Sequence, residues 1–206
     1  MRDWTPPHPD DHHTAPRVGV LASQGDFAAH IAMLRELGAD AHEVRTAHQI
    51  AALDALVIPG GESTTITKAI ARDGLESAIR AHNAAGRPIL GTCAGMIVCD
   101  REHLGLINAR ARRNAFGRQL ASFEADLIID GIGPEPLRAV FIRAPWIEDH
   151  GPGVDVLAEV DGHPVVVREG QVLAAAFHPE LTDDPRLHAM LMAMASERVE
   201  ARGETR

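Results

Sequence analysis

One pattern repeats through the first half of the chain: a short apolar run, a polar or glycine-rich turn, and a stretch with helical periodicity. Strands are expected at the apolar runs, residues 18–22, 41–44, 55–58 and 89–90. Helices are expected after the turns, at residues 27–34, 64–71 and 75–85. Strands that alternate with helices favour βαβ units, and therefore a parallel sheet covered by helices.

The second half of the chain consists mainly of β-rich runs separated by glycine and proline. These runs are residues 120–129, 137–142, 154–160, 164–167 and 172–177. Because little helix intervenes, we expect antiparallel strands to be added to the parallel sheet. A last helix is expected over residues 185–195. We therefore predict an α/β fold with three layers, α/β/α, around a mixed, largely parallel central sheet of the flavodoxin-like kind.

Length and composition favour one domain. The chain has 206 residues, 45% apolar and 3% aromatic, so one sizeable core of mainly aliphatic side chains is expected. Residues 1–16 contain four prolines, three histidines and three aspartates and are predicted to be a flexible N-terminal extension. Residues 17–197 are predicted to form the domain, and residues 198–206 a flexible C-terminal tail.

Charge and cysteine content exclude several classes of protein. A net charge of −9 argues against nucleic acid as a partner. No apolar stretch reaches the roughly 18 residues of a membrane span, so no membrane association is expected. Two cysteines do not suggest a secreted disulfide scaffold, and a cytoplasmic location is expected. Histidines 8, 12 and 13 are interpreted as part of a solvated tail, so neither a metal nor a cofactor is expected.

The most informative motif is Gly91-Thr92-Cys93-Ala94-Gly95, which follows an apolar strand and precedes a predicted helix. It has the form of the strand-to-helix elbow of Gly-x-Ser-x-Gly hydrolases, with a thiol in place of the hydroxyl. The start of a helix favours a thiolate, and the backbone N–H of Ala94 is placed to stabilise an oxyanion. The alternative is a buried cysteine in a tight turn. Cys99 lacks these features and is interpreted as core packing.

A thiol nucleophile needs a base and a group that orients the base. His178-Pro179-Glu180 follows an apolar run, so the imidazole is expected at the carboxyl end of a strand, with Glu180 as its hydrogen-bond acceptor. Alone, this triplet is equally compatible with a structural histidine, and its value comes from its pairing with the elbow. Other histidines lie among polar residues and are interpreted as surface groups, including His42, His48, His82 and His103.

With these motifs in place, the chain resembles the class I glutamine amidotransferases, and among them the glutaminase subunits of pyridoxal 5′-phosphate synthase. The resemblance spans residues 18–188. Its blocks are Gln24-Gly25-Asp26-Phe27 with His30, Pro59-Gly60-Gly61-Glu62-Ser63-Thr64-Thr65, the elbow, Arg113-Asn114-Ala115-Phe116-Gly117-Arg118-Gln119, Phe141-Ile142-Arg143-Ala144-Pro145 and Phe177-His178-Pro179-Glu180-Leu181-Thr182. The two arginine blocks separate this family from other amidotransferases.

The resemblance implies a role for each matching residue. Cys93, His178 and Glu180 are implied as the catalytic triad, with Gly61 and Ala94 as backbone donors of the oxyanion hole. The implied L-glutamine site contains Gly61, Glu62, Ser63, Arg113, Ile142 and Arg143. Two alternatives stay open: Glu62 and Ser63 are also suited to capping a helix, and Arg113 to a solvated surface. Arg143, in an apolar run, is expected to be buried and paired.

The resemblance also implies a partner. Ammonia released from glutamine is implied to pass to a (β/α)₈-barrel synthase subunit within a large hetero-oligomer that makes pyridoxal 5′-phosphate. The chain departs from the family pattern at Ser23, in the short segment 98–103 and in the N-terminal extension. Rival hypotheses are the glutaminase of another synthase, such as imidazole glycerol phosphate synthase, and a non-catalytic thiol sensor.

Overall fold

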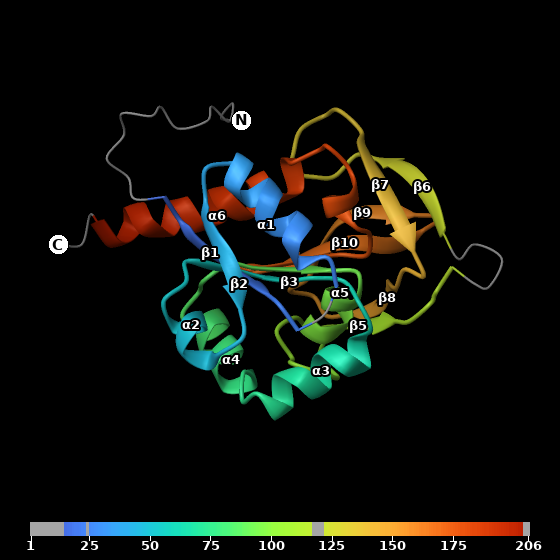
Figure 1. Ribbon diagram of the computed structural model, residues 1–206. Helices are drawn as coiled ribbons and strands as arrows, with labels where there is room; N and C mark the ends of the chain where they lie inside the picture. The colour runs from blue at the N-terminus through green and yellow to red at the C-terminus, as the bar shows by residue number, and fades with distance from the viewer. Residues whose placement is uncertain (1–14, 24, 117–121, 204–206) are drawn as a thin grey trace.

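The computed structural model describes residues 15–23, 25–116 and 122–203 and contains a seven-stranded central sheet (Figure 1). The strand order is β2-β1-β3-β4-β11-β10-β9. Five strands are parallel: β1 (Arg17–Leu21), β2 (Asp40–Val44), β3 (Ala55–Ile58), β4 (Ile89–Thr92) and β11 (Val172–Ala175). Next come two antiparallel strands, β10 (His163–Glu169) and β9 (Asp155–Val160). The predicted mixed, largely parallel sheet is confirmed.

Helices cover both faces of this sheet and complete the predicted three layers (Figure 1). One face carries α1 (Phe27–Glu36) and α6 (Arg186–Gly203). The other face carries α2 (Ala47–Ala51), α3 (Ser63–Arg72), α4 (Glu76–Ala84) and α5 (Ala94–Cys99). The α1 helix begins where Asp26 caps it, because the Asp26 side chain accepts a hydrogen bond from the backbone N–H of Ala29.

Two strand pairs stand apart from the central sheet. One is β6 (Ser122–Leu127) with β7 (Leu137–Ile142), and the other is β5 (Ala109–Arg112) with β8 (Trp146–His150). The expectation that residues 120–129 and 137–142 join the central sheet was therefore wrong. Alternate residues of β7 are exposed, so this strand cannot lie between two helical layers. β5 and β8 are rich in charged residues and were not predicted.

The structure describes most of the predicted C-terminal tail but little of the predicted N-terminal extension. Residues 198–203, expected to lie in a flexible tail, continue helix α6 as far as Gly203. The predicted N-terminal extension lies outside the described residues, apart from residues 15 and 16.

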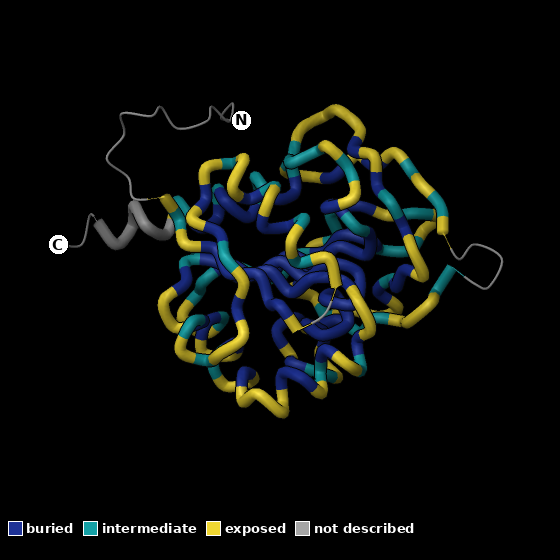
Figure 2. Tube along the Cα trace, viewed as in Figure 1, coloured by how far each residue is buried: buried dark blue, intermediate teal, exposed yellow. Residues whose placement is uncertain are grey.

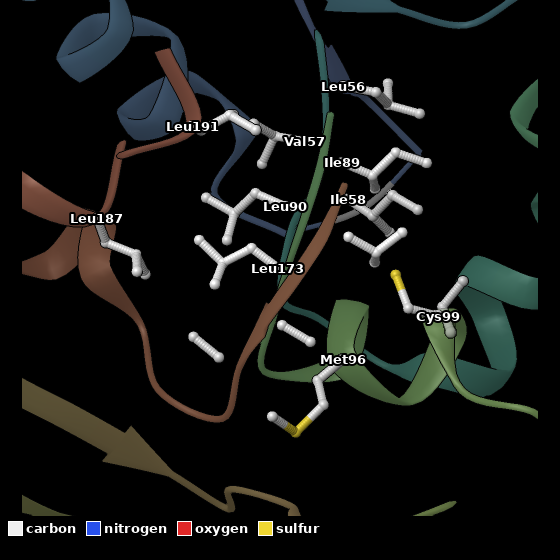
Figure 3. Close-up of a cluster of buried hydrophobic side chains, with 14 of the residues drawn as sticks. Leu56, Val57, Ile58, Ile89, Leu90, Met96, Cys99, Leu173, Leu187 and Leu191 are labelled. Atoms are coloured by element: carbon white, nitrogen blue, oxygen red, sulfur yellow. The ribbon is translucent and has the colours of Figure 1, made fainter. Parts of the chain in front are cut away.

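The core is centred on the parallel strands (Figure 2). Leu187 and Leu191 of α6 pack on one side of these strands, while Met96 and Cys99 of α5 pack on the other (Figure 3). Burial, with a contribution from the neighbouring Asp100 carboxylate, raises the pKa of Cys99 to about 12, which fits core packing. Among the described residues, no helix is both long and apolar enough to cross a bilayer.

Candidate active site

The predicted elbow is present between β4 and α5. Cys93 has φ 48° and ψ −107°, a backbone conformation that L-residues rarely adopt. The flanking glycines are required by close packing. A Cβ on Gly91 would lie 2.7 Å from the carbonyl oxygen of Gly95, and one on Gly95 would collide with the carbonyl oxygen of Ile58. The turn therefore holds the Cys93 thiol at the carboxyl end of the sheet.

His178 reaches Cys93 because their strands are neighbours. β4 and β11 are parallel, and Thr92 pairs with Ala175. The backbone N–H of Cys93 donates to the carbonyl oxygen of Ala175 at 2.8 Å, and that of His178 donates to Val140 at 2.9 Å. The carboxyl ends of adjacent parallel strands meet at one edge, so the two side chains lie close together, near enough for Cys93 to raise the pKa of His178.

Glu180 orients the His178 ring. Its Oε1 lies 2.8 Å from His178 Nδ1, and its side chain is 1% exposed. Burial lowers the pKa of His178, but hydrogen bonds and charge interactions with Cys93 and Glu180 outweigh it and raise the pKa to about 10. The imidazole is therefore held as an imidazolium between a sulfur and a carboxylate. This arrangement suits an activated thiol with a proton donor beside it.

The turn after β3 forms another wall of the site. A Cβ built on Gly60 would lie 2.6 Å from Cε1 of His178 and 3.4 Å from Cβ of Cys93. Gly61 has φ 139°, which a glycine adopts without strain. Sequence reasoning identified Gly61 but missed Gly60, although the glycine pair itself signals a close approach.

Three of the predicted glutamine-site residues gather at the start of α3. Glu62 caps this helix by accepting hydrogen bonds from the N–H groups of Thr64 at 3.0 Å and Thr65 at 2.8 Å. Hydrogen bonds from Thr65, then from Thr64, lower the pKa of Glu62 to about 2. Ser63 is the first helical residue and is buried, and Arg113 donates to the Thr64 hydroxyl at 3.0 Å. Arg113 is exposed but reaches this helix terminus.

Ile142 and Arg143 come from the end of β7. The carbonyl oxygen of Ile142 lies 3.9 Å from the Cys93 sulfur, so the backbone of this residue borders the thiol. Arg143 was expected to be buried, and this was wrong: the residue is exposed, with φ 46°. The apolar run ends at this position because the chain turns sharply out of the strand.

Three further histidines are buried, which the sequence interpretation did not predict. His82, interpreted as a surface group, is 3% exposed in α4. His30 and His188 are fully buried behind Glu180 and were not assigned a role. Both occur among apolar residues at helical spacing, next to Ile31 and Leu187. A histidine within an apolar stripe is the signal that marks them.

Two departures from the family pattern, Ser23 and the segment 98–103, fall on described residues. Ser23 is exposed just after β1. The segment after α5 is organised by Asp100, which is fully buried and accepts hydrogen bonds from the backbone N–H groups of Glu102, His103 and Ala111.

Comparison with known proteins identifies the family. A model of the SNO glutamine amidotransferase family matches residues 20–197. The chain belongs to this family. It is 54% identical to the pyridoxal 5′-phosphate synthase subunit PdxT of Acidothermus cellulolyticus, with 88% of this chain and 94% of that protein covered. The protein of the same name from Mycobacterium leprae is 51% identical, with 86% and 95% covered.

Solved structures share the fold of this chain. A crystal structure of a glutamine amidotransferase superposes with a TM-score of 0.82 at 46% identity, covering 87% of this chain and 98% of that one. A putative GMP synthase protein from Thermoplasma acidophilum matches with a TM-score of 0.75 at 21% identity, covering 93% of this chain and 100% of that one, which shows the shared fold.

Proposed function

We propose that this glutamine amidotransferase is the glutaminase subunit of a pyridoxal 5′-phosphate synthase, and that Cys93, His178 and Glu180 hydrolyse L-glutamine to L-glutamate and ammonia. The observation that carries the proposal is the convergence of a strained cysteine, a histidine and a buried carboxylate at the ends of β4 and β11. Relatives about half identical in sequence bear the name of this subunit.

The first half of the reaction forms a thioester. The Cys93 thiolate attacks the side-chain amide carbon of glutamine, and the carbonyl oxygen becomes an oxyanion. Backbone N–H groups of Gly61 and Ala94 are the proposed donors to this oxyanion. The proton on His178 passes to the amide nitrogen, the C–N bond breaks, and ammonia leaves. The proton held by the imidazolium, whose pKa is raised to about 10, is thus consumed in this step.

The second half restores the enzyme. His178, now neutral, takes a proton from a water molecule that attacks the thioester. The C–S bond then breaks, glutamate leaves, and the thiolate and imidazolium form again. Glu180 stabilises the positive charge on the ring each time it appears, and its hydrogen bond to Nδ1 at 2.8 Å keeps Nε2 directed at the reacting atoms.

Substrate binding is assigned to the residues around the nucleophile. Arg113 is proposed to hold the glutamine carboxylate, since guanidinium groups pair well with carboxylates. Gly61, Glu62 and Ser63 line the site beside the helix terminus that Arg113 contacts through Thr64. Ile142 and Arg143 are also proposed to line the site, since the Ile142 carbonyl oxygen lies 3.9 Å from the sulfur.

Ammonia must reach its acceptor before water protonates and dilutes it. We therefore propose that the chain docks on a (β/α)₈-barrel synthase subunit in a large hetero-oligomer. The cytoplasm is the proposed location, because a catalytic thiol has to remain reduced and both cysteines are free.

A comparison of two nitrogen sources tests the function. Cys93→Ala, mixed with the synthase subunit, should lose pyridoxal 5′-phosphate formation from glutamine but retain formation from ammonium salts. His178→Asn should behave in the same way. Glutamine-dependent synthesis that persists in Cys93→Ala would refute the assigned nucleophile. Because ammonium salts bypass this chain, synthesis lost with both nitrogen sources would show an inactive synthase subunit, and thermal unfolding of each variant shows whether it has folded.

A further inference from the structure

A buried pair of histidines continues the triad into the core. Nδ1 of His30, in α1, lies 2.8 Å from Nε2 of His188, in α6. Nε2 of His30 faces Oε2 of Glu180 at 3.3 Å and the hydroxyl oxygen of Thr92 at 3.4 Å. Both histidines are 0% exposed, and the Glu180 side chain is 1% exposed. Helix α1, strand β4 and helix α6, which are remote in sequence, thus meet at Glu180 behind the catalytic imidazole.

The surroundings determine which ring nitrogens carry protons. Burial, with smaller contributions from His188 and His178, lowers the pKa of His30 well below 6.5, and burial lowers that of His188 to about 4. Both rings are therefore neutral near pH 7, with one donor and one acceptor each. A bare Nε2 of His30 would place its lone pair against the Glu180 carboxylate. The proton consequently resides on Nε2 of His30, and its Nδ1 accepts from Nε2–H of His188.

Two buried atoms without a hydrogen-bond partner among the described residues, Oε2 of Glu180 and Nδ1 of His188, fit this assignment of protons. Glu180 Oε2 accepts no well-aligned hydrogen bond from the described residues, and Nε2–H of His30 is the donor that faces it. Nδ1 of His188 is buried without a hydrogen-bond partner among the described residues, which an unprotonated nitrogen tolerates better than an N–H does. The donors therefore point in one direction: Nε2–H of His188 donates to Nδ1 of His30, and Nε2–H of His30 faces Oε2 of Glu180 at 3.3 Å.

We propose that His30, held by His188, is a positioning residue that fixes the Glu180 carboxylate and, through it, the catalytic imidazole of His178. The proposal rests on the glutaminase function proposed above. Glu180 uses Oε1 for His178, so the orientation of the carboxylate is decided by what holds Oε2. His30 supplies that contact from a helix of the opposite end of the chain.

Two other roles fit this pair less well. The 2.8 Å between the two nitrogens is a hydrogen-bond distance, whereas two nitrogens bound to one tetrahedral zinc ion would be about 3.3 Å apart. No cluster suited to a metal occurs among the described residues. A proton path to solvent would need an exposed end, and both rings are fully buried.

Paired substitutions at residue 30 test the proposal. His30→Leu removes the donor and fills the buried site with an apolar side chain, whereas His30→Gln keeps an N–H group at a similar reach. With the synthase subunit present, His30→Leu should lower kcat roughly tenfold to a hundredfold, with KM changed less than about threefold. NMR titration of the free chain should show the pKa of His178 lowered by about one unit. His30→Gln should recover most of both losses.

The control is a buried histidine remote from the triad. His82 is 3% exposed in α4, on the opposite face of the sheet from α1. His82→Leu should lower the melting temperature but leave kcat and the titration of His178 unchanged. If His30→Leu does not fold, His188→Leu compared with His188→Gln applies the same criterion one step further from Glu180.

The outcomes separate the two proposals. An unchanged His178 titration in His30→Leu, or equal losses of kcat in His30→Leu and His30→Gln without any change in that titration, would overturn the positioning role. A wild-type chain without glutaminase activity in the presence of the synthase would instead overturn the proposed function. The titration of His178 needs no activity, so it tests the positioning role in either case.

Discussion

Gly60→Ala is a substitution whose effect can be worked out from the structure. The new Cβ would lie 2.6 Å from Cε1 and 3.2 Å from Nδ1 of His178, whereas ordinary contact begins at 3.4 Å. The shortfall from 3.4 Å to 2.6 Å is 0.8 Å, so the ring or the turn must move by about that amount. Because Glu180 holds Nδ1 of His178 at 2.8 Å, the ring cannot retreat without losing this hydrogen bond.

A displacement of this size should affect the reaction more than the fold. Misplacing a catalytic group by about 1 Å can cost about a hundredfold in rate, so kcat for glutamine should fall by roughly this factor. Overpacking typically destabilises a core by about 1–3 kcal/mol, a fraction of the stability of an ordinary domain. The backbone of Gly60 does not have a positive φ, so alanine adds no conformational strain of its own.

The assay is glutamine hydrolysis in the presence of the synthase subunit, with thermal unfolding measured on the same samples. Gly153→Ala is the matched control, because its new Cβ would meet only the flexible carboxylate of Glu169, at 3.1 Å, and its φ is not positive. It should retain wild-type kcat. A Gly60→Ala variant that folds and keeps wild-type kcat would show that the turn does not restrain His178, and the reasoning would fail.

Three further predictions concern the charge on His178 and the buried ring of Phe141. Glu180→Gln should lower the pKa of His178 from about 10 by about one to two units, because the imidazolium loses its carboxylate partner and keeps only a neutral amide acceptor, and NMR titration of the ring checks this. His178 has a pKa above its unfolded value of about 6.5, so its contribution to stability is complete below that pH and is lost as the pH rises towards 10. Urea unfolding between these pH values should accordingly show a smaller decline in His178→Asn than in the wild type. Phe141→Ala should cost about 3–5 kcal/mol by denaturant unfolding, since the ring is fully buried and stacks on Phe123 at 4.6 Å, while Phe27→Ala, partly exposed, should cost less.

Local signals in the sequence predicted the features that depend on neighbouring residues. The apolar runs located the parallel strands, and the glycines around Cys93 predicted the elbow, because a sharp turn excludes side chains from its flanks. The triplet from His178 to Glu180 placed a base and its carboxylate within hydrogen-bonding distance of each other.

Features that depend on contacts between remote elements were missed or misplaced. The exposure of Arg143 follows from where β7 ends against the rest of the fold, and its apolar neighbours in sequence do not report this. The separate pairing of β6 with β7 could not be told from pairing with the central sheet, since either arrangement satisfies the same backbone hydrogen bonds.

The sequence by itself determined the layered fold and the elbow at Cys93, because periodicity and turn chemistry act within a few residues along the chain. Only the tertiary structure decided what surrounds the Cys93 thiol. Gly60 lies against the His178 ring, and His30 meets His188 across 158 positions of sequence. The physical reason is that such contacts form when whole elements pack on a sheet. The strength of a hydrogen bond between two buried rings does not depend on how far apart the two residues are along the chain.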